Sequence, residues 1–315
     1  MKILIFGAGG VGSVVGGFLA RMGHDVSLLG RAAYLDPVIE RGLILTGIWG
    51  DYRVKAFTVY RSHKELLAKK PDLDLIMLTV KSYDTEQAVG ELVPLLGERT
   101  MLLALQNGLG NIETILKRVP AERFLAGRVI FGVETEPGLA RVTVSADAIR
   151  IGAMPQTRTL VSAESLAHTF TLAKLDTRPV GNILSVLWAK AIYNCALNAI
   201  CTLHEIPYGR ILESAATQSS MESVVRECYA VAQAKGILLD VTTPEAYVRC
   251  LTQDLIPRTA AHYPSMLQDI RKGKRTDIDA LNGAIVRYGR ESGVPTPENE
   301  SLTAAIHHKM GRDRM

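Results

Sequence analysis

The residues best placed to do chemistry form a stripe along one apolar segment. Lys190, Asn194 and Asn198 stand four residues apart within Leu184–Leu203, where nearly every other side chain is apolar, aromatic or small. This spacing puts one ammonium and two amides on one face of a helix, where they are expected to line a cleft. An ammonium there suits protonation of a carbonyl oxygen as hydride reaches carbon, which makes Lys190 a candidate general acid. The alternative is that the amides cap loops or satisfy buried backbone groups.

Three further polar segments are candidates for the same site. Asn107, in Gln106-Asn107-Gly108 after the apolar run Met101–Leu105, is placed to bridge a nicotinamide and a substrate, with a simple Asn-Gly turn as the alternative. The segments Ser265–Asp269 and Thr276–Asp279 carry hydroxyl and carboxylate groups. Ser265 also suits a helix cap and Asp277 a helix start, so spacing alone does not choose between these interpretations.

A glycine-rich turn predicts a dinucleotide site close to the start of the chain. It fits G-x-G-x-x-G, follows the apolar run Lys2–Phe6 and opens a helix; it reads Gly7-Ala8-Gly9-Gly10-Val11-Gly12. In this context Gly7 makes the tight turn, Gly9 lets a pyrophosphate approach the backbone, and Gly12 lets the helix pack closely on the strand. The helix N-terminus adds N–H groups and the positive end of its dipole.

The residue after the second strand indicates which cofactor binds. An acidic residue there would accept bonds from a ribose 2′-hydroxyl, whereas this chain has Arg31, whose guanidinium pairs with a 2′-phosphate. NADPH is therefore favoured. Lys81 follows the run Leu73–Val80 on the same rim and is a second candidate for that phosphate. A solvated loop arginine and an ordinary surface lysine are the alternatives.

Short apolar runs alternate with helix-like segments in the first half of the chain. Near-continuous apolarity over five to eight residues is typical of strands buried on both faces of a parallel sheet. Residues 124–153 read as a hairpin across Pro137-Gly138, and residues 175–180 as a further strand. We predict an α/β Rossmann, doubly wound sheet in an NADP-binding domain of residues 1–181. The predicted strands before the hairpin are Lys2–Phe6, Asp25–Leu29, Leu73–Val80 and Met101–Leu105, with helical spacing in segments such as Asp84–Leu96.

No strand pattern recurs after about Gly181. We predict an all-helical C-terminal domain, residues 182–315, that binds the substrate and carries the catalytic lysine. Its predicted helices are Leu184–Leu203, Ser214–Lys235, Pro244–Asp254, Ser265–Lys272 and Asp277–Ser292.

Composition narrows the function classes. The 315 residues carry a formal net charge of +4 with no dense basic block, which suits an acidic metabolite and argues against nucleic acid. The four cysteines form no C-x-x-C pair, so we expect free thiols and no metal site. The N-terminal apolar run is too short for a signal peptide or a membrane span, and we expect a cytoplasmic protein that does not bind membranes. A homodimer and a monomer both fit the sequence.

Together these segments resemble the ketopantoate reductase family (2-dehydropantoate 2-reductases). The resemblance implies a Rossmann domain followed by a helical domain like that of 6-phosphogluconate dehydrogenase, and NADPH-dependent reduction of 2-dehydropantoate to (R)-pantoate on the way to pantothenate and coenzyme A. It implies that Lys190 is the proton donor, that Asn107 touches cofactor and substrate, and that Arg31 and Lys81 hold the 2′-phosphate. The substrate's hydroxyl and carboxylate are then held by Asn194, Asn198 and Ser265.

Three positions of the implied site depart from the family pattern. Asp277, expected to serve catalysis and cofactor binding, stands where the family has glutamate, and is one methylene shorter. Tyr208 and His262, expected to touch the substrate, stand where asparagines are common. The chemistry is expected to survive with a reshaped pocket. A reductase of another branched or aromatic 2-oxo acid therefore stays open, as does a non-catalytic NADPH-sensing protein, which the retained Lys190 argues against.

Overall fold

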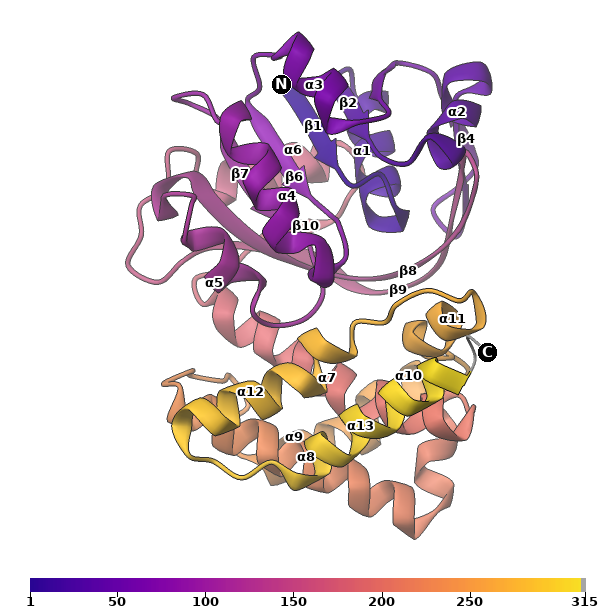
Figure 1. The fold of residues 1–315 in the computed structure, drawn as a ribbon, viewed down its shortest axis with the longest axis vertical. Coiled ribbons are helices and arrows are strands. Elements are labelled where there is room, and N and C mark those ends of the chain that lie inside the picture. Colours follow the sequence, from indigo (N-terminus) through magenta and orange to yellow (C-terminus); the bar gives the residue numbers. More distant parts are fainter. Residues whose placement is uncertain (313–315) are drawn as a thin grey trace. The chain divides into compact units, whose positions relative to one another are not determined.

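The computed structural model describes residues 1–312 and divides into two compact units (Figure 1). The first comprises Met1–Gln106 and Asn111–Ile183, and the second comprises Asn107–Gly110 and the chain from Leu184 onwards. The predicted fold class is confirmed, because a Rossmann-type sheet is followed by a helical unit.

The first unit is an α/β sheet with helices on both faces. Its parallel core has the order β5-β2-β1-β6-β7-β8, the strand order of a doubly wound dinucleotide-binding sheet. Antiparallel β9 then leads to β3 and β4, and β10 pairs with β9. The strands are β1 (Lys2–Phe6), β2 (Asp25–Leu29), β3 (Leu43–Gly47), β4 (Tyr52–Val54), β5 (Phe57–Tyr60), β6 (Leu75–Leu78), β7 (Met101–Ala104), β8 (Phe124–Glu136), β9 (Leu139–Ala153) and β10 (Thr177–Pro179).

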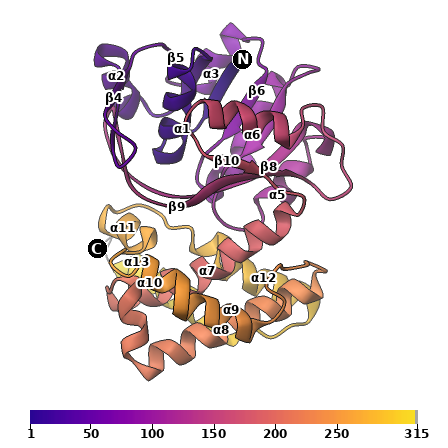
Figure 2. The same ribbon diagram turned by 180° about the vertical axis from the view of Figure 1, so that it is seen from behind.

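Alternate residues of the central strands enter separate cores, which explains their continuous apolarity. Ile3 and Ile5 pack in one core with α1 and α6, which lie on the same face of the sheet (Figure 2). Leu4, between them, is fully buried on the other face, which α4 covers (Figure 1). The helices are α1 (Gly10–Arg21), α2 (Ala32–Arg41), α3 (His63–Lys69), α4 (Thr85–Leu92), α5 (Asn111–Leu116) and α6 (Ala163–Leu172).

Helix α1 is rich in glycine because it is pressed against strands on two sides. A Cβ at Gly12 would lie 2.6 Å from the Gly7 carbonyl oxygen and 2.7 Å from a methyl carbon of Ile5 on β1. A Cβ at Gly17 would lie 2.8 Å from Leu45 on β3. These clearances are below van der Waals contact, so the helix fits only without these side chains.

Replacing Gly12 by alanine is therefore expected to lower the free energy of unfolding by about 1–3 kcal/mol, the usual cost of overpacking. Denaturant unfolding measures it. Gly181→Ala is the matched control, because a Cβ there meets no atom within 4 Å. Equal unfolding midpoints for the two variants would contradict this account of the packing.

An ion-pair cluster of Arg128, Asp147 and Arg150 stabilises the β8–β9 hairpin. Arg128, whose side chain is 10% exposed, donates to Asp147 at 2.5 Å, and Arg150 donates to the same carboxylate at 3.1 Å. Partial burial alone would raise the pKa of Asp147, but these two bonds and one from the Ala148 N–H outweigh it and lower the pKa to about 2.

The pH dependence of stability follows from that depressed pKa. The contribution of Asp147 is complete above its ordinary pKa of 3.8 and is lost as pH falls through about 2. The free energy of unfolding of the wild type should therefore fall more steeply between these pH values than that of Asp147→Asn, measured by urea unfolding. Parallel curves for the two proteins would rule out this role for Asp147.

The second unit is helical and is built around α7. Its core joins α7 to α8, α9, α12 and α13 and also takes in Leu109 of the Asn107–Gly110 segment. Short 3₁₀ turns occupy Tyr208–Glu213 and Ile278–Ala280, and a π-helical turn occupies Leu251–Leu255. The helices are α7 (Ile183–His204), α8 (Ala215–Ala234), α9 (Pro244–Cys250), α10 (Ile256–Arg258), α11 (Ser265–Arg271), α12 (Asn282–Ser292) and α13 (Pro297–Arg312).

A buried polar network fixes four of these helices. Asn282 of α12 donates to the Cys195 carbonyl of α7 at 3.1 Å and to Asn299 of α13 at 3.0 Å. Glu227 of α8 accepts the backbone N–H groups of Glu298 and Asn299, and so caps α13. The bond to Cys195 fixes α7 one residue beyond Asn194.

Helix α7 is long and apolar enough to cross a membrane, but 61% of its most apolar window is buried inside the protein. That burial identifies it as the core helix of the second unit. The four cysteines of the chain are free; Cys195, Cys201 and Cys228 are buried, and Cys250 is half-buried. The cytoplasmic location stays a prediction.

Two predicted helix boundaries are wrong. The helix predicted from Asp277 begins at Asn282, because Ile278–Ala280 forms a 3₁₀ turn and Leu281, at φ −109° and ψ −105°, interrupts the helical backbone. The helix predicted over Pro244–Asp254 ends as an α-helix at Cys250 and continues as the π turn.

Candidate active site

The glycine turn of the first unit has the geometry of a phosphate cradle. Gly7 has φ +107°, a conformation that favours glycine, and its carbonyl accepts a bond from the Thr79 hydroxyl at 2.7 Å. A Cβ at Gly9 would meet no atom closer than the Gly7 carbonyl oxygen, 4.0 Å away, so the turn is open where a pyrophosphate would approach. The N–H groups of the first turn of α1 have no carbonyl partner within the helix. These residues fit a dinucleotide.

Basic side chains follow the strands at the carboxyl edge of the same sheet. Arg31 is exposed at the N-cap of α2, two residues after β2. Arg61 follows β5, which pairs with β2 in parallel, and Asp36 of α2 holds its guanidinium at 2.7 Å. Lys81 is half-buried at the start of the 3₁₀ turn Ser82–Asp84. Arg61 was not predicted as a candidate, because the short strand β5 that precedes it was not predicted from the sequence.

The predicted segment Gln106–Gly108 is divided between the two units. Gln106 donates to the Val80 carbonyl at 3.0 Å and to the Thr85 hydroxyl at 2.7 Å, and so ties the end of β7 to the chain after β6. Asn107 belongs to the helical unit, where the Leu109 N–H donates to the Ala280 carbonyl at 2.7 Å. Gln106 thus has a structural role beside a candidate substrate residue.

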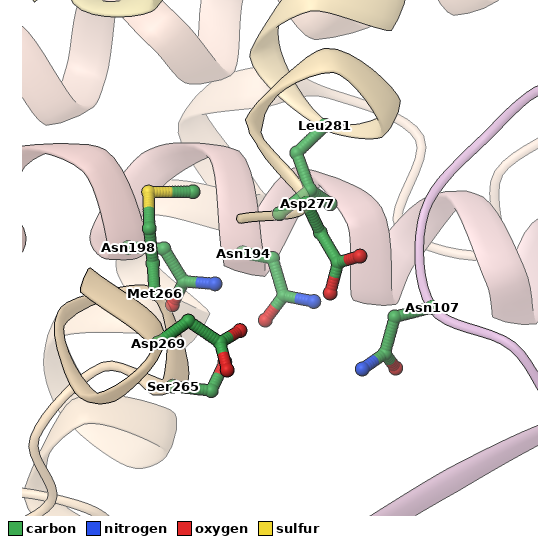
Figure 3. A pocket seen from close by; sticks show the side chains of 8 residues that line it. All are labelled: Asn107, Asn194, Asn198, Ser265, Met266, Asp269, Asp277 and Leu281. Atoms are coloured by element: carbon green, nitrogen blue, oxygen red, sulfur yellow. The ribbon is translucent and has the colours of Figure 1, made fainter. Parts of the chain in front are cut away.

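A polar pocket in the helical unit gathers residues from four segments of the chain (Figure 3). Three amides, one hydroxyl and two carboxylates line it, with two apolar side chains at its edge. Within residues 1–312, no group of three or more His, Cys, Asp or Glu residues is arranged to hold a metal ion. The lining residues are Asn107, Asn194, Asn198, Ser265, Met266, Asp269, Asp277 and Leu281.

Lys190 is joined to this pocket through Asn107. Its ammonium donates to the Asn107 side-chain carbonyl at 2.5 Å. Lys190 lies four residues before Asn194 on α7, so the predicted stripe of ammonium and amides forms on one helix. The bond also turns the amide nitrogen of Asn107 away from the lysine.

The two segments for which a helix start was the alternative interpretation both supply pocket residues. Ser265 is the first residue of α11, its side chain makes no capping bond, and it lines the pocket. The Asp277 carboxylate points into the pocket between Asn194 and Asn107 (Figure 3). Asp269, one helical turn after Ser265, also lines the pocket; its segment was a candidate in the sequence, but no role was assigned to its carboxylate, although the four-residue spacing signalled one.

Comparisons with known proteins identify the family of the chain and agree with its fold. The family model described as "Ketopantoate reductase PanE/ApbA" matches residues 3–156, and its C-terminal counterpart matches residues 182–310. The chain belongs to the ketopantoate reductase family. Members are oxidoreductases acting on CH–OH donors, so membership removes the non-catalytic alternative.

Relatives in this family cover the whole chain. The 2-dehydropantoate 2-reductase of Aquifex aeolicus (strain VF5) is 37% identical over 310 residues, covering 98% of this chain and 97% of the relative. That of Pyrococcus horikoshii is 36% identical over 316 residues, with the same coverage.

Solved structures extend the likeness to the fold. A PanE/ApbA family ketopantoate reductase from Ralstonia eutropha JMP134 superimposes with a TM-score of 0.89 at 32% identity and full coverage of both chains. D-mandelate dehydrogenase with NADH and anilino(oxo)acetate superimposes at 0.88 with 29% identity, also over both full chains.

Tyr208 and His262, which were expected from the sequence to contact the substrate, lie behind the pocket wall. Tyr208 is 4% exposed, and its hydroxyl donates to the Asn198 side-chain carbonyl at 2.5 Å. The His262 ring packs on Tyr208 with centroids 5.4 Å apart, and burial lowers the pKa of His262. Neither residue is among those that line the pocket. Their predicted contact with substrate stays a prediction.

Proposed function

We propose that this protein reduces 2-dehydropantoate to (R)-pantoate with NADPH, as a step toward pantothenate and coenzyme A. The observation that carries the proposal is the lysine–amide pair, Lys190 and Asn107, at a pocket whose other polar groups are amides, a hydroxyl and carboxylates. The amide and hydroxyl donors of this pocket suit the oxygens of a 2-oxo acid.

Lys190 acts as the general acid. The turn from Gly7 to Gly12 and Arg31 would hold NADPH, which would supply the hydride for the carbonyl carbon of the substrate. As the carbonyl oxygen gains negative charge, the Lys190 ammonium gives it a proton, and the lysine is reprotonated from solvent. Asn107, hydrogen-bonded to the ammonium at 2.5 Å, holds it in position for this transfer. Asp277 brings a carboxylate to the same pocket, from which we propose that it orients the bound reactants.

The polarity of the pocket supports a hydroxylated substrate. Asn194, Asn198 and Ser265 can donate to the carboxylate and hydroxyl oxygens of 2-dehydropantoate. The Asp269 carboxylate can accept a hydrogen bond from the substrate hydroxyl. A substrate with a hydrocarbon group in place of the hydroxyl would desolvate these pocket side chains without giving them a hydrogen-bond partner, which costs binding energy.

The proposed use of NADPH depends on the carboxyl edge of the sheet in the first unit. The turn from Gly7 to Gly12 fits a pyrophosphate, and Arg31 presents an exposed guanidinium after β2, where a ribose 2′-phosphate is recognised. No side chain within residues 1–312 forms an ion pair with Arg31. Lys81 is proposed to assist.

Initial rates of NADPH oxidation test the proposal. We expect kcat/KM for 2-dehydropantoate to exceed that for 3,3-dimethyl-2-oxobutanoate, which lacks only the hydroxyl, by about 100-fold. Phenylglyoxylate should fall further below. A higher value for either competitor would overturn the proposed substrate and leave the reductase chemistry intact.

A second candidate is a reductase of an aromatic 2-oxo acid. The likeness to D-mandelate dehydrogenase and the rings of Tyr208 and His262, next to the pocket wall, favour it. A kcat/KM for phenylglyoxylate above that for 2-dehydropantoate would select this candidate.

A further inference from the structure

The hydrogen bond between Tyr208 and Asn198 decides which side of an amide faces the pocket. The Tyr208 hydroxyl donates to the carbonyl oxygen of the Asn198 side chain at 2.5 Å, and Asn198 itself is only 3% exposed. Because the carbonyl is engaged, the amide nitrogen is directed to the other side. Figure 3 shows this nitrogen pointing into the pocket, toward Asn194. Asn198 thus offers N–H donors to a ligand.

Tyr208 is itself held in place from several directions. Its ring meets Tyr193 edge-on, with centroids 5.8 Å apart, and packs on His262. Its backbone N–H donates to the His262 carbonyl at 3.0 Å, and the Gly209 N–H donates to the Ala260 carbonyl at 2.9 Å. Deep burial raises the pKa of Tyr208 well above its ordinary value, so the phenol keeps its proton and stays a donor.

We propose that Tyr208 is a positioning residue that fixes Asn198 as a hydrogen-bond donor to an oxygen of the substrate. This inference rests on the proposed function, since it takes the pocket as the substrate site. Without the phenol, the amide of Asn198 can rotate and present its carbonyl to the substrate, where it would repel a carboxylate or hydroxyl oxygen. Tyr208 therefore acts on the substrate through Asn198.

Tyr208→Phe is the direct test, because it removes only the hydroxyl. We expect KM for 2-dehydropantoate to rise about 10-fold, the value of one lost hydrogen bond. The kcat should stay within about 2-fold, because Lys190 keeps its place. Tyr193→Phe is the matched control: its hydroxyl lies in the same aromatic cluster and bonds Thr259 at 2.9 Å, so KM should not change.

A double-mutant cycle separates positioning from general packing. In the Asn198→Ala background the amide is gone, so adding Tyr208→Phe should change KM by less than about 2-fold. A 10-fold rise in that background, an equal rise from Tyr193→Phe, or an unchanged KM in Tyr208→Phe itself would each overturn the proposal. Thermal unfolding midpoints confirm that the variants are folded.

KM values for two substrates show which substrate oxygen accepts the hydrogen bond from Asn198. They also distinguish a failure of this inference from a failure of the proposed function. If Asn198 donates to the hydroxyl, Tyr208→Phe raises KM for 2-dehydropantoate alone; if it donates to the carboxylate, KM for 3,3-dimethyl-2-oxobutanoate rises equally. Either result supports positioning. If the wild type prefers another 2-oxo acid, the proposed function fails, and the same cycle run with that acid still decides the role of Tyr208.

Discussion

Lys190→Ala is expected to lower kcat about 1,000-fold, within the range for removing a general acid. Lys190 lies in the α7 stripe, and its ammonium donates to the pocket residue Asn107 at 2.5 Å. KM for NADPH should change little, because the glycine turn and Arg31 lie in the other unit. Stopped-flow measurement of NADPH oxidation over one turnover reports the chemical step directly.

The Lys190→Arg variant distinguishes proton donation by Lys190 from the attraction of its positive charge for the substrate. The guanidinium keeps the positive charge that attracts a 2-oxo acid, but its pKa is too high for efficient proton transfer. We expect kcat to fall at least about 100-fold while KM for the 2-oxo acid stays within a few-fold. Lys274→Ala, an exposed lysine of the same unit, is the control. A kcat within 5-fold of wild type in Lys190→Ala would mean that another group donates the proton.

Arg31→Ala is expected to reduce the preference for NADPH over NADH. One charge-assisted contact to a 2′-phosphate is worth about 1.5–3 kcal/mol, so kcat/KM for NADPH should fall about 10- to 100-fold. NADH lacks that phosphate, so its kcat/KM should stay within about 3-fold. Steady-state rates with each cofactor at saturating 2-oxo acid give both values.

Arg99→Ala is the matched control for the cofactor experiment. This exposed arginine precedes β7 and therefore lies at the amino edge of the sheet, away from the edge where ligands bind. If Arg31→Ala lowers kcat/KM equally with NADPH and with NADH, the arginine supports the fold of α2 and does not bind the 2′-phosphate. An unchanged NADPH preference would move recognition to Lys81 or Arg61.

Continuous patterns in the sequence predicted most of the fold. The strands Lys2–Phe6 and Asp25–Leu29 were predicted with their observed bounds, because strands buried on both faces are almost continuously apolar. The hairpin across Pro137-Gly138 and the long helix α7 also followed from pattern alone. The short strands β3, β4 and β5 were missed, since three to five residues of mixed polarity carry little periodic signal.

The candidate site was harder to predict where contacts depend on tertiary structure. The spacing on α7 brought together Lys190, Asn194 and Asn198 because neighbours on a helix are fixed by local geometry. Nothing local shows that Tyr208 folds back onto Asn198, or that a 3₁₀ turn carries Asp277 to the pocket. These placements are set by packing against distant segments, which periodicity does not report.

The segment Asn107–Gly110 limits how this protein can be recombined with its relatives. Its four residues leave the sheet unit after Gln106, pack on Ala280 through a backbone hydrogen bond at 2.7 Å, and return at Asn111. A chimera that exchanges residues 1–183 as one continuous block for those of another dehydrogenase therefore also exchanges Asn107, the amide that holds Lys190. Engineers who want a new cofactor preference should transplant the edge around Arg31 alone and leave this loop with its native helical partner.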